Sequence, residues 1–236
     1  MLTNIEYDQI LWRPLAKVLG KRVWTESVGK VGAEPLYTID GKPVLWRDVC
    51  RMRKAPTKFG DQTIEKSEID FLVPATIKAE PTTINHVLKV FATARIPIGC
   101  RFRISPKILT KYGDVKVEKS YWARHTWSIV EGTRNKEAQV REQIISDKSE
   151  GLYRLPMVIE ELIFHFLALQ VGLKSGCRKE PLTYTQCIEF IQEENGIYPV
   201  YVGGFDDPTP DDTGGINCSC NCYVREPDGA AAVRPF

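Results

Sequence analysis

The stretch from Leu155 to Leu173 constrains the fold most, because nearly every residue in it is apolar. Pro156, with its fixed φ angle, suits the opening position of a helix, and Gly172 and Gly176 indicate where that helix ends. A helix that is apolar on all sides has no face for solvent. The sequence therefore predicts a buried helix at the centre of the protein.

The same stretch is about as long as a membrane-spanning helix, but polar residues interrupt it and no flanking charge pattern favours insertion. We therefore expect no membrane partner. The N-terminal sequence MLTNIEYDQILW carries acidic residues where a signal peptide needs a positive region followed by an apolar run. This predicts that no signal peptide directs export. The interrupting residues are Glu160, Glu161, His165 and Gln170.

The cysteines predict synthesis in a reducing, cytoplasmic compartment. Their number, seven, is odd, and Cys50, Cys100, Cys177 and Cys187 each stand alone in the sequence. A disulfide framework would show an even number of cysteines at paired spacings.

Local patterns predict two further helices. Residues 4–20 have helical periodicity, with Asn4 as the N-cap and Gly20 at the end. Residues 183–196 are predicted as a helix because Thr183 and Gln186 form a capping box and a glycine follows the apolar stripe. Residues 83–94 fit a strand or a short helix, and periodicity leaves both open.

The remaining patterns are extended. Asp40-Gly41 predicts a tight hairpin turn, and residues 69–104 are mostly strand-like. Two further strands are predicted over 198–204 and 216–226, with a flexible acidic loop between them.

A long two-stranded ribbon is predicted in the middle of the chain. Its strands would be residues 114–131 and 137–147, joined by a turn over 132–135. Part of this ribbon is expected to project beyond the core, where a lone hairpin is only marginally stable unless it contacts another surface.

These elements predict an α+β fold. It would have a mostly antiparallel β core, sandwich-like or barrel-like, with a long hairpin, an N-terminal helix and two helices in the C-terminal half. We divide the chain into a basic N-terminal helix and hairpin (1–60), a β-rich main domain with two helices (61–225) and an extended arm (226–236), or else one continuous domain.

Charge is distributed unevenly along the 236 residues, although the net charge is only +2. Residues 1–60 carry 11 basic and 6 acidic side chains, or +5; residues 61–177 carry 17 and 14, or +3; residues 178–236 carry 4 and 10, or −6. Such a layout could steer one end of a copy toward the other end of its neighbour, giving rings. The alternative is a set of separate solvated faces with no partner.

Two groups of residues suggest a metal site. Thiolates at Cys218, Cys220 and Cys222 could bind a soft metal ion, and Glu161 and His165 lie four residues apart on one helix face. The simpler interpretations are a half-buried strand, since residues 216–224 alternate between two faces, and a buried hydrogen-bonded pair. The sequence favours these, so we expect no metal and no cofactor.

Basic residues interleaved with aromatic ones suggest a nucleic-acid surface, which could neutralise phosphates and stack bases. Acidic neighbours dilute this segment, and no known DNA- or RNA-binding motif is present. Nucleic-acid binding through residues 101–127 is therefore the alternative function, and a Cys218/Cys220/Cys222 metalloprotein is another. The segment's candidate residues are Arg101, Arg103, Lys107, Lys111, Trp122 and Arg124.

Catalytic signatures are absent from the sequence. There is no G-x-S-x-G, no P-loop and no G-x-G-x-x-G, and the acidic loop lacks the spacing of a calcium site. We therefore expect a non-enzymatic protein, and no small-molecule substrate is inferred.

A β-rich chain with a long charged ribbon (YWARHTWSIVEGTRNKEAQVREQIISD) and an extended arm (EPDGAAAVRPF) resembles the structural proteins of tailed-phage virions. The resemblance implies a neck or tail subunit whose hairpins and arms join neighbours into homo-oligomeric rings with other assembly subunits. The resemblance assigns no functional residues; from the arm and the ribbon themselves, the candidate interface residues are Val233, Pro235, Phe236, Gly132 and Arg134.

The arm is expected to be mobile in the monomer and to become fixed when Phe236 docks onto a neighbour. The alternative is a frayed terminus with no role.

Overall fold

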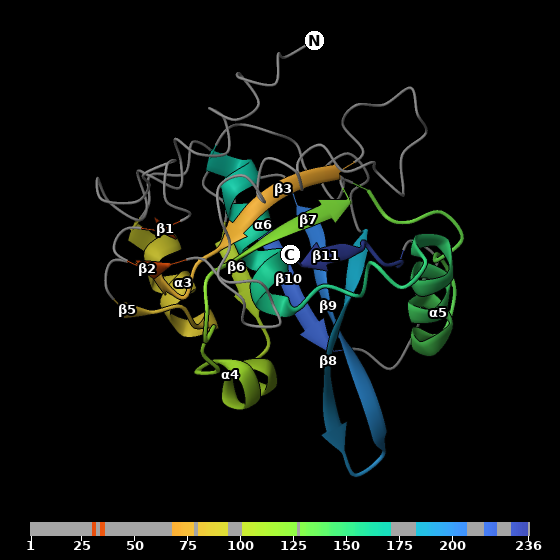
Figure 1. The fold of residues 1–236 in the computed structure, drawn as a ribbon. Helices are drawn as coiled ribbons and strands as arrows, with labels where there is room; N and C mark the ends of the chain where they lie inside the picture. Colours follow the sequence, from red (N-terminus) through yellow and green to blue (C-terminus); the bar gives the residue numbers. More distant parts are fainter. Residues whose placement is uncertain are drawn as a thin grey trace.

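The computed structural model describes residues 30–31, 34–35, 68–77, 80–93, 101–126, 128–170, 183–206, 215–220 and 228–235. Over these residues the protein has an α+β fold in which helices pack against open β-sheets (Figure 1). This confirms the predicted class, while the described strands do not close into a barrel. The predicted helix over 4–20 and the hairpin at Asp40-Gly41 lie outside the described residues. Among those residues no helix is long and apolar enough to cross a membrane.

A four-stranded sheet forms one part of the fold, in the order β6, β10, β9, β8. β8 and β9 form an antiparallel hairpin, β9 pairs antiparallel with β10, and β10 pairs parallel with β6. β9 confirms the strand predicted over 198–204, and β10 confirms the first part of the strand predicted over 216–226. The strands are β6 (Arg101–Ile104), β8 (Tyr184–Glu193), β9 (Gly196–Asp206) and β10 (Gly215–Cys220).

A three-stranded antiparallel sheet forms a second part, with β7 between β11 and β3. All six side chains of β7 are buried, as expected for the central strand of a covered sheet. Two short ribbons, β1–β2 and β4–β5, complete the described strands. The strands are β3 (Glu68–Val73), β7 (Tyr121–Thr126), β11 (Val233–Pro235), β1 (Lys30–Val31), β2 (Glu34–Pro35), β4 (Thr76–Ile77) and β5 (Glu80–Pro81).

Helix α6 (Val158–Gln170) confirms the predicted central helix. It contacts β3 of the three-stranded sheet, β8 and β9 of the four-stranded sheet, and helix α3 (Ile84–Thr93). Every side chain from residue 158 to 166 is buried. α6 therefore joins the two sheets into one core, and α3 settles the choice left open for residues 83–94 in favour of a helix.

The helix predicted over 183–196 is wrong, because these residues form strand β8 and the turn into β9. β8 is rich in β-branched and aromatic residues, which pack well in a sheet, and it pairs with β9 near both of its ends, with a register shift between Gln186 and Phe190. The capping-box pattern is present, but the Gln186 side chain accepts a hydrogen bond from Arg141 instead of capping a helix. Pairing with a neighbouring strand outweighs the local cap signal here.

The ribbon predicted over 114–131 and 137–147 is also wrong. Only β7 is extended, and it pairs with β3 and β11. The second half forms helix α5 (Ala138–Ser149), whose buried residues Arg141, Ile145 and Ser149 lie four apart on one face. The turn does exist: Gly132 has a φ of +87°, a conformation that favours glycine.

The arm predicted over 226–236 is not an unattached segment of the monomer. Residues 228–233 are buried, and β11 pairs with β7 of the same chain. Small side chains allow this, since Ala230, Ala231 and Ala232 fit where larger residues would not, and each is at most 2 % exposed. The arm was expected to be mobile, but the small size of its alanine side chains lets it enter the core.

Candidate functional site

Two of the three cysteines considered as alternative metal ligands, Cys218 and Cys220, lie on β10. Cys218 is 2 % exposed and Cys220 is half-buried, while Cys222 lies outside the described residues. Burial raises the pKa of the Cys218 thiol well above its ordinary value, which opposes the thiolate form that a metal needs. β10 confirms the interpretation of this segment as a half-buried strand.

Glu161 and His165 do come together on α6, and His125 of β7 joins them. One Glu161 oxygen lies 2.5 Å from His125 Nε2, and the other lies 3.1 Å from His165 Nε2. Burial alone would raise the pKa of Glu161, but the charge and hydrogen bond of His125, together with His165, lower it to about 2. Among the described residues no group of three such side chains is arranged to hold a metal ion.

His125 explains why this cluster is structural. Its Nδ1 lies 2.5 Å from the Thr126 carbonyl oxygen and its Nε2 faces the Glu161 carboxylate. Both ring nitrogens therefore face hydrogen-bond acceptors inside the core. The ring also stacks on Phe164, with centroids 4.0 Å apart. No signal in the sequence gave His125 a partner, because Glu161 lies 36 residues further along the chain.

A second buried carboxylate, Glu160, is also fully paired. Arg154 donates two hydrogen bonds to it, at 2.8 and 2.7 Å. The Tyr121 hydroxyl and the Met157 backbone N–H donate to it as well, each at 2.7 Å. Every oxygen of this carboxylate therefore has donors, which is the arrangement that stabilises a buried charge.

Arg141 of α5 is a buried cation bound by neutral acceptors. Its side chain donates to the carbonyl oxygens of Thr133 and Asp228, at 3.0 Å each, and to the Gln186 side chain and the Tyr201 hydroxyl, at 3.2 Å each. These groups come from the turn before α5, the C-terminal segment, β8 and β9. Arg141 therefore fastens the buried C-terminal segment to the rest of the core.

The residues predicted to bind nucleic acid do not share one exposed face. Trp122 and Arg124 are buried in β7, at 3 % and 4 % exposure, while Arg101 and Arg103 lie on β6 of the other sheet. Lys107 pairs with Glu193 at 2.5 Å, and Lys111 donates to the Phe190 carbonyl oxygen. Two of the lysines thus bind the β8–β9 hairpin.

The residues predicted at an interface are likewise dispersed. Val233 is fully buried in β11, Pro235 is half-buried in the same strand, and Phe236 lies outside the described residues. Gly132 is exposed and Arg134 is half-buried in the turn before helix α5.

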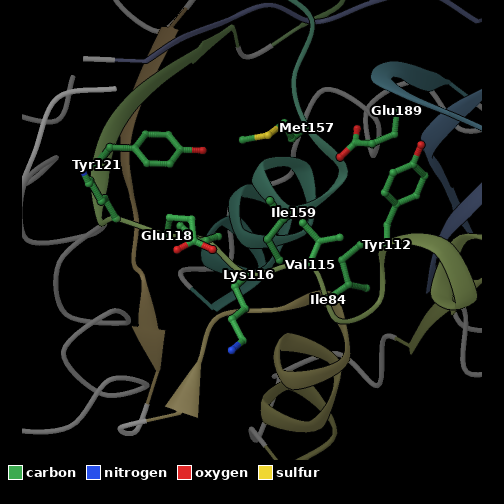
Figure 2. A pocket seen from close by; sticks show the side chains of 11 residues that line it. Ile84, Tyr112, Val115, Lys116, Glu118, Tyr121, Met157, Ile159 and Glu189 are labelled. Atoms are coloured by element: carbon green, nitrogen blue, oxygen red, sulfur yellow. The ribbon is translucent and has the colours of Figure 1, made fainter. Parts of the chain in front are cut away.

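A cavity of about 330 Å³ lies between the loop that links α4 (Pro106–Tyr112) to β7, the start of α6, and β8 (Figure 2). Its most unusual wall residue is Glu189. Burial raises the pKa of this carboxyl to about 7, against the hydrogen bond from the Val158 backbone N–H, which lowers it. Sequence reasoning missed this residue, since it was assigned to a helix.

The chain has no recognisable counterpart in the comparisons with known proteins. No protein-family model matches it, and neither a curated protein nor a solved structure does.

Proposed function

We propose that this chain is a non-enzymatic structural subunit that assembles with copies of itself, as the neck and tail subunits of phage virions do. The observation that carries this proposal is the outer part of the β8–β9 hairpin, which extends beyond the other strands of the four-stranded sheet (Figure 1). The hairpin is not the ribbon expected at 114–147. Like that expected ribbon, it is a pair of strands whose outer part pairs with no third strand among those described.

Among the described strands none flanks the outer half of the hairpin, which helix α4 contacts through Lys107, Lys111 and Tyr112. β10 pairs with β9 only as far as Cys220, which lies opposite Val200. Beyond that point, residues 190–199 of β8 and β9 pair only with each other among the described strands. A two-stranded hairpin is marginally stable alone, so this part gains from contact with another surface.

One face of the hairpin is apolar and exposed. Ile188, Phe190 and Ile197 are 45 %, 44 % and 62 % exposed. Residues two apart on a strand share a face, as do residues directly opposite, and Phe190 lies opposite Pro199 while Gln192 lies opposite Ile197. Phe190 and Ile197 therefore share one side of the hairpin; together with the exposed Ile188, which lies at the register shift just before Phe190, they make up what we call the hairpin face.

The free edge of β8 is covered, so the hairpin face is the surface offered to a partner. Gln186 N–H donates to Gly229, and Ile188 N–H donates to Pro156. Further along, the Phe190 carbonyl oxygen accepts from the Tyr112 hydroxyl at 2.6 Å. These contacts occupy the backbone groups that would otherwise pair with a strand of another chain.

Charge favours a second copy of this chain as the partner. The hairpin belongs to the acidic residues 178–236, at −6, whereas residues 1–60 carry +5. A contact between such unlike surfaces is heterologous and closes into a ring when the rotation allows. A stable interface buries about 1,200–2,000 Å² in total, so the hairpin face would be its anchor within a larger contact.

The test is the oligomeric state, measured by sedimentation velocity at micromolar concentrations. The double variant Ile188→Ser, Ile197→Ser should dissociate at a concentration at least about tenfold higher than the wild type. Val140→Ser is the matched control, because Val140 on α5 is also 43 % exposed, and it should assemble normally. A wild type that stays monomeric, alone and with candidate virion partners, would refute the proposal; so would unchanged assembly of the double variant.

A further inference from the structure

The cavity beside Glu189 has walls built from six parts of the chain. The start of α3 supplies Ile84, the end of α4 supplies Tyr112, and the start of α6 supplies Met157 and Ile159. The loop over residues 113–120, Tyr121 of β7 and Glu189 of β8 complete the lining. At about 330 Å³ the cavity reaches the lower end of the range of small-molecule sites.

The loop wall is held in place at both ends. Asn85 N–H donates to the Gly113 carbonyl oxygen at 3.0 Å, and Val117 N–H donates to that of Thr82, also at 3.0 Å. Gly113 allows this close approach, because an added Cβ would lie 2.3 Å from the Leu109 carbonyl oxygen. Backbone hydrogen bonds to residues 82 and 85 therefore fix the loop that forms this wall of the cavity.

The cavity wall is largely apolar, and Glu189 is the carboxylate next to its inner end. Figure 2 shows the Glu189 carboxylate between Met157 and the Tyr112 ring, while the Lys116 ammonium is directed away from it. Lys116, Glu118 and Lys119 are exposed on the loop. The inner end thus combines aromatic and aliphatic surface with a single acid.

Glu189 has no cationic partner among the described residues. Both of its oxygens accept from one donor, the Val158 backbone N–H, at 3.0 Å each. Its own backbone N–H is a second donor, and a half-buried carboxylate with so few donors keeps lone pairs free for another one. Glu160 and Arg154 also act on it through their charges, but these two groups are bound to each other.

We infer that this cavity binds a small organic ammonium ion, whose N–H groups donate to Glu189 and whose apolar body lies against Met157, Ile159 and the Tyr112 ring. An ammonium ion supplies both the charge and the hydrogen-bond donors that the carboxylate lacks. The electron-rich aromatic ring adds a favourable contact for a cation. An anion would find no buried cation at the inner end of the cavity among the described residues.

Three probes of the same shape test the inference: phenethylamine, phenylethanol and phenylacetate, titrated into the full chain and followed by NMR at pH 8, where a carboxyl with a pKa of about 7 is ionised. The amine should bind with a dissociation constant of about 1 mM, typical of so small a ligand, and at least about tenfold more tightly than the alcohol and the acid.

Two variants assign the binding to this carboxylate. Glu189→Gln should bind the amine and the alcohol about equally, whereas Glu118→Gln, on the exposed loop, should keep the wild-type preference. Val115→Trp tests the same site if Glu189→Gln fails to fold. Val115 is exposed and lines the cavity, so a tryptophan there should fill the cavity and abolish binding of all three probes. Equal binding of amine and alcohol to the wild type, binding of none of the probes up to about 10 mM, or an unchanged preference in Glu189→Gln would overturn the inference.

Discussion

Two regions beside the start of α6 surround their carboxylates with different hydrogen-bonding partners. Glu160 and Glu161, on the helix itself, are completely buried and each has a basic partner, Arg154 or His125. Glu189 on β8 faces the same helix start, but the donors it finds among the described residues are backbone N–H groups, that of Val158 and its own. The first two carboxylates stabilise the fold. The third has oxygen lone pairs that can still accept hydrogen bonds from a ligand. Their neighbours, more than their burial, separate structural from functional roles.

The largest effect should come from breaking a paired carboxylate. Arg154→Met leaves Glu160 buried without a cation, so we expect the free energy of unfolding to fall by about 4 kcal/mol at pH 7, the usual cost of an uncompensated buried charge. Urea denaturation measures it. Lys116→Met, which removes an exposed cation, should change stability by less than about 0.5 kcal/mol. Equal losses in the two variants would contradict the pairing argument.

Acid should remove the contribution of Glu161. Its pKa is lowered to about 2, so its stabilisation is complete above the ordinary carboxyl pKa of 4.5 and is lost as the pH falls toward 2. This loss is on the order of 3 kcal/mol. Glu161→Gln should be less stable than the wild type at pH 6, and the difference should shrink toward pH 2. A difference that stays constant with pH would show that Glu161 does not act through its charge.

Glu189 should show the opposite dependence on pH. Because the folded state raises its pKa to about 7, the folded protein holds this proton more tightly than the unfolded chain, and stability falls as the pH rises from about 4.5 to 7. Glu189→Gln should therefore be more stable than the wild type by about 2 kcal/mol at pH 8 and nearly equal to it at pH 4. Thermal denaturation across this range measures the effect, and a destabilised Glu189→Gln at pH 8 would contradict it.

The smallest effect on stability is expected at the hairpin face. Ile197 is 62 % exposed, so Ile197→Ser removes little buried surface and should change the free energy of unfolding by less than about 0.5 kcal/mol. Circular dichroism during urea denaturation provides the measurement. Ile191→Ser, on the paired strand β8 at a position that is 5 % exposed, should cost several times as much. If the two variants are equally stable, the assignment of inner and outer faces is wrong.

The parts of this fold that were predictable are those whose signal is local and strong. The helix containing Glu160 and Glu161 could be predicted because no face of it suits solvent, and β10 because its cysteines alternate with polar residues. β8 could not, since its capping-box pattern is local while its pairing with β9 is not. The candidate sites depend on contacts between residues far apart in the sequence. His125 contacts Glu161, and Glu189 contacts the start of α6, only in the folded chain.

The buried segment over 228–235 has a consequence for how this chain folds. Ala232 N–H donates to the Thr126 hydroxyl oxygen 106 residues earlier in the sequence, so a long loop must close before this contact contributes. Chains rich in such distant contacts fold in about milliseconds to seconds, slower than helical bundles. Without β11, one edge of strand β7 would be open, and an open strand edge is a template for aggregation. β11 therefore covers an edge that could otherwise pair with the wrong chain, through contacts that require a long loop to close.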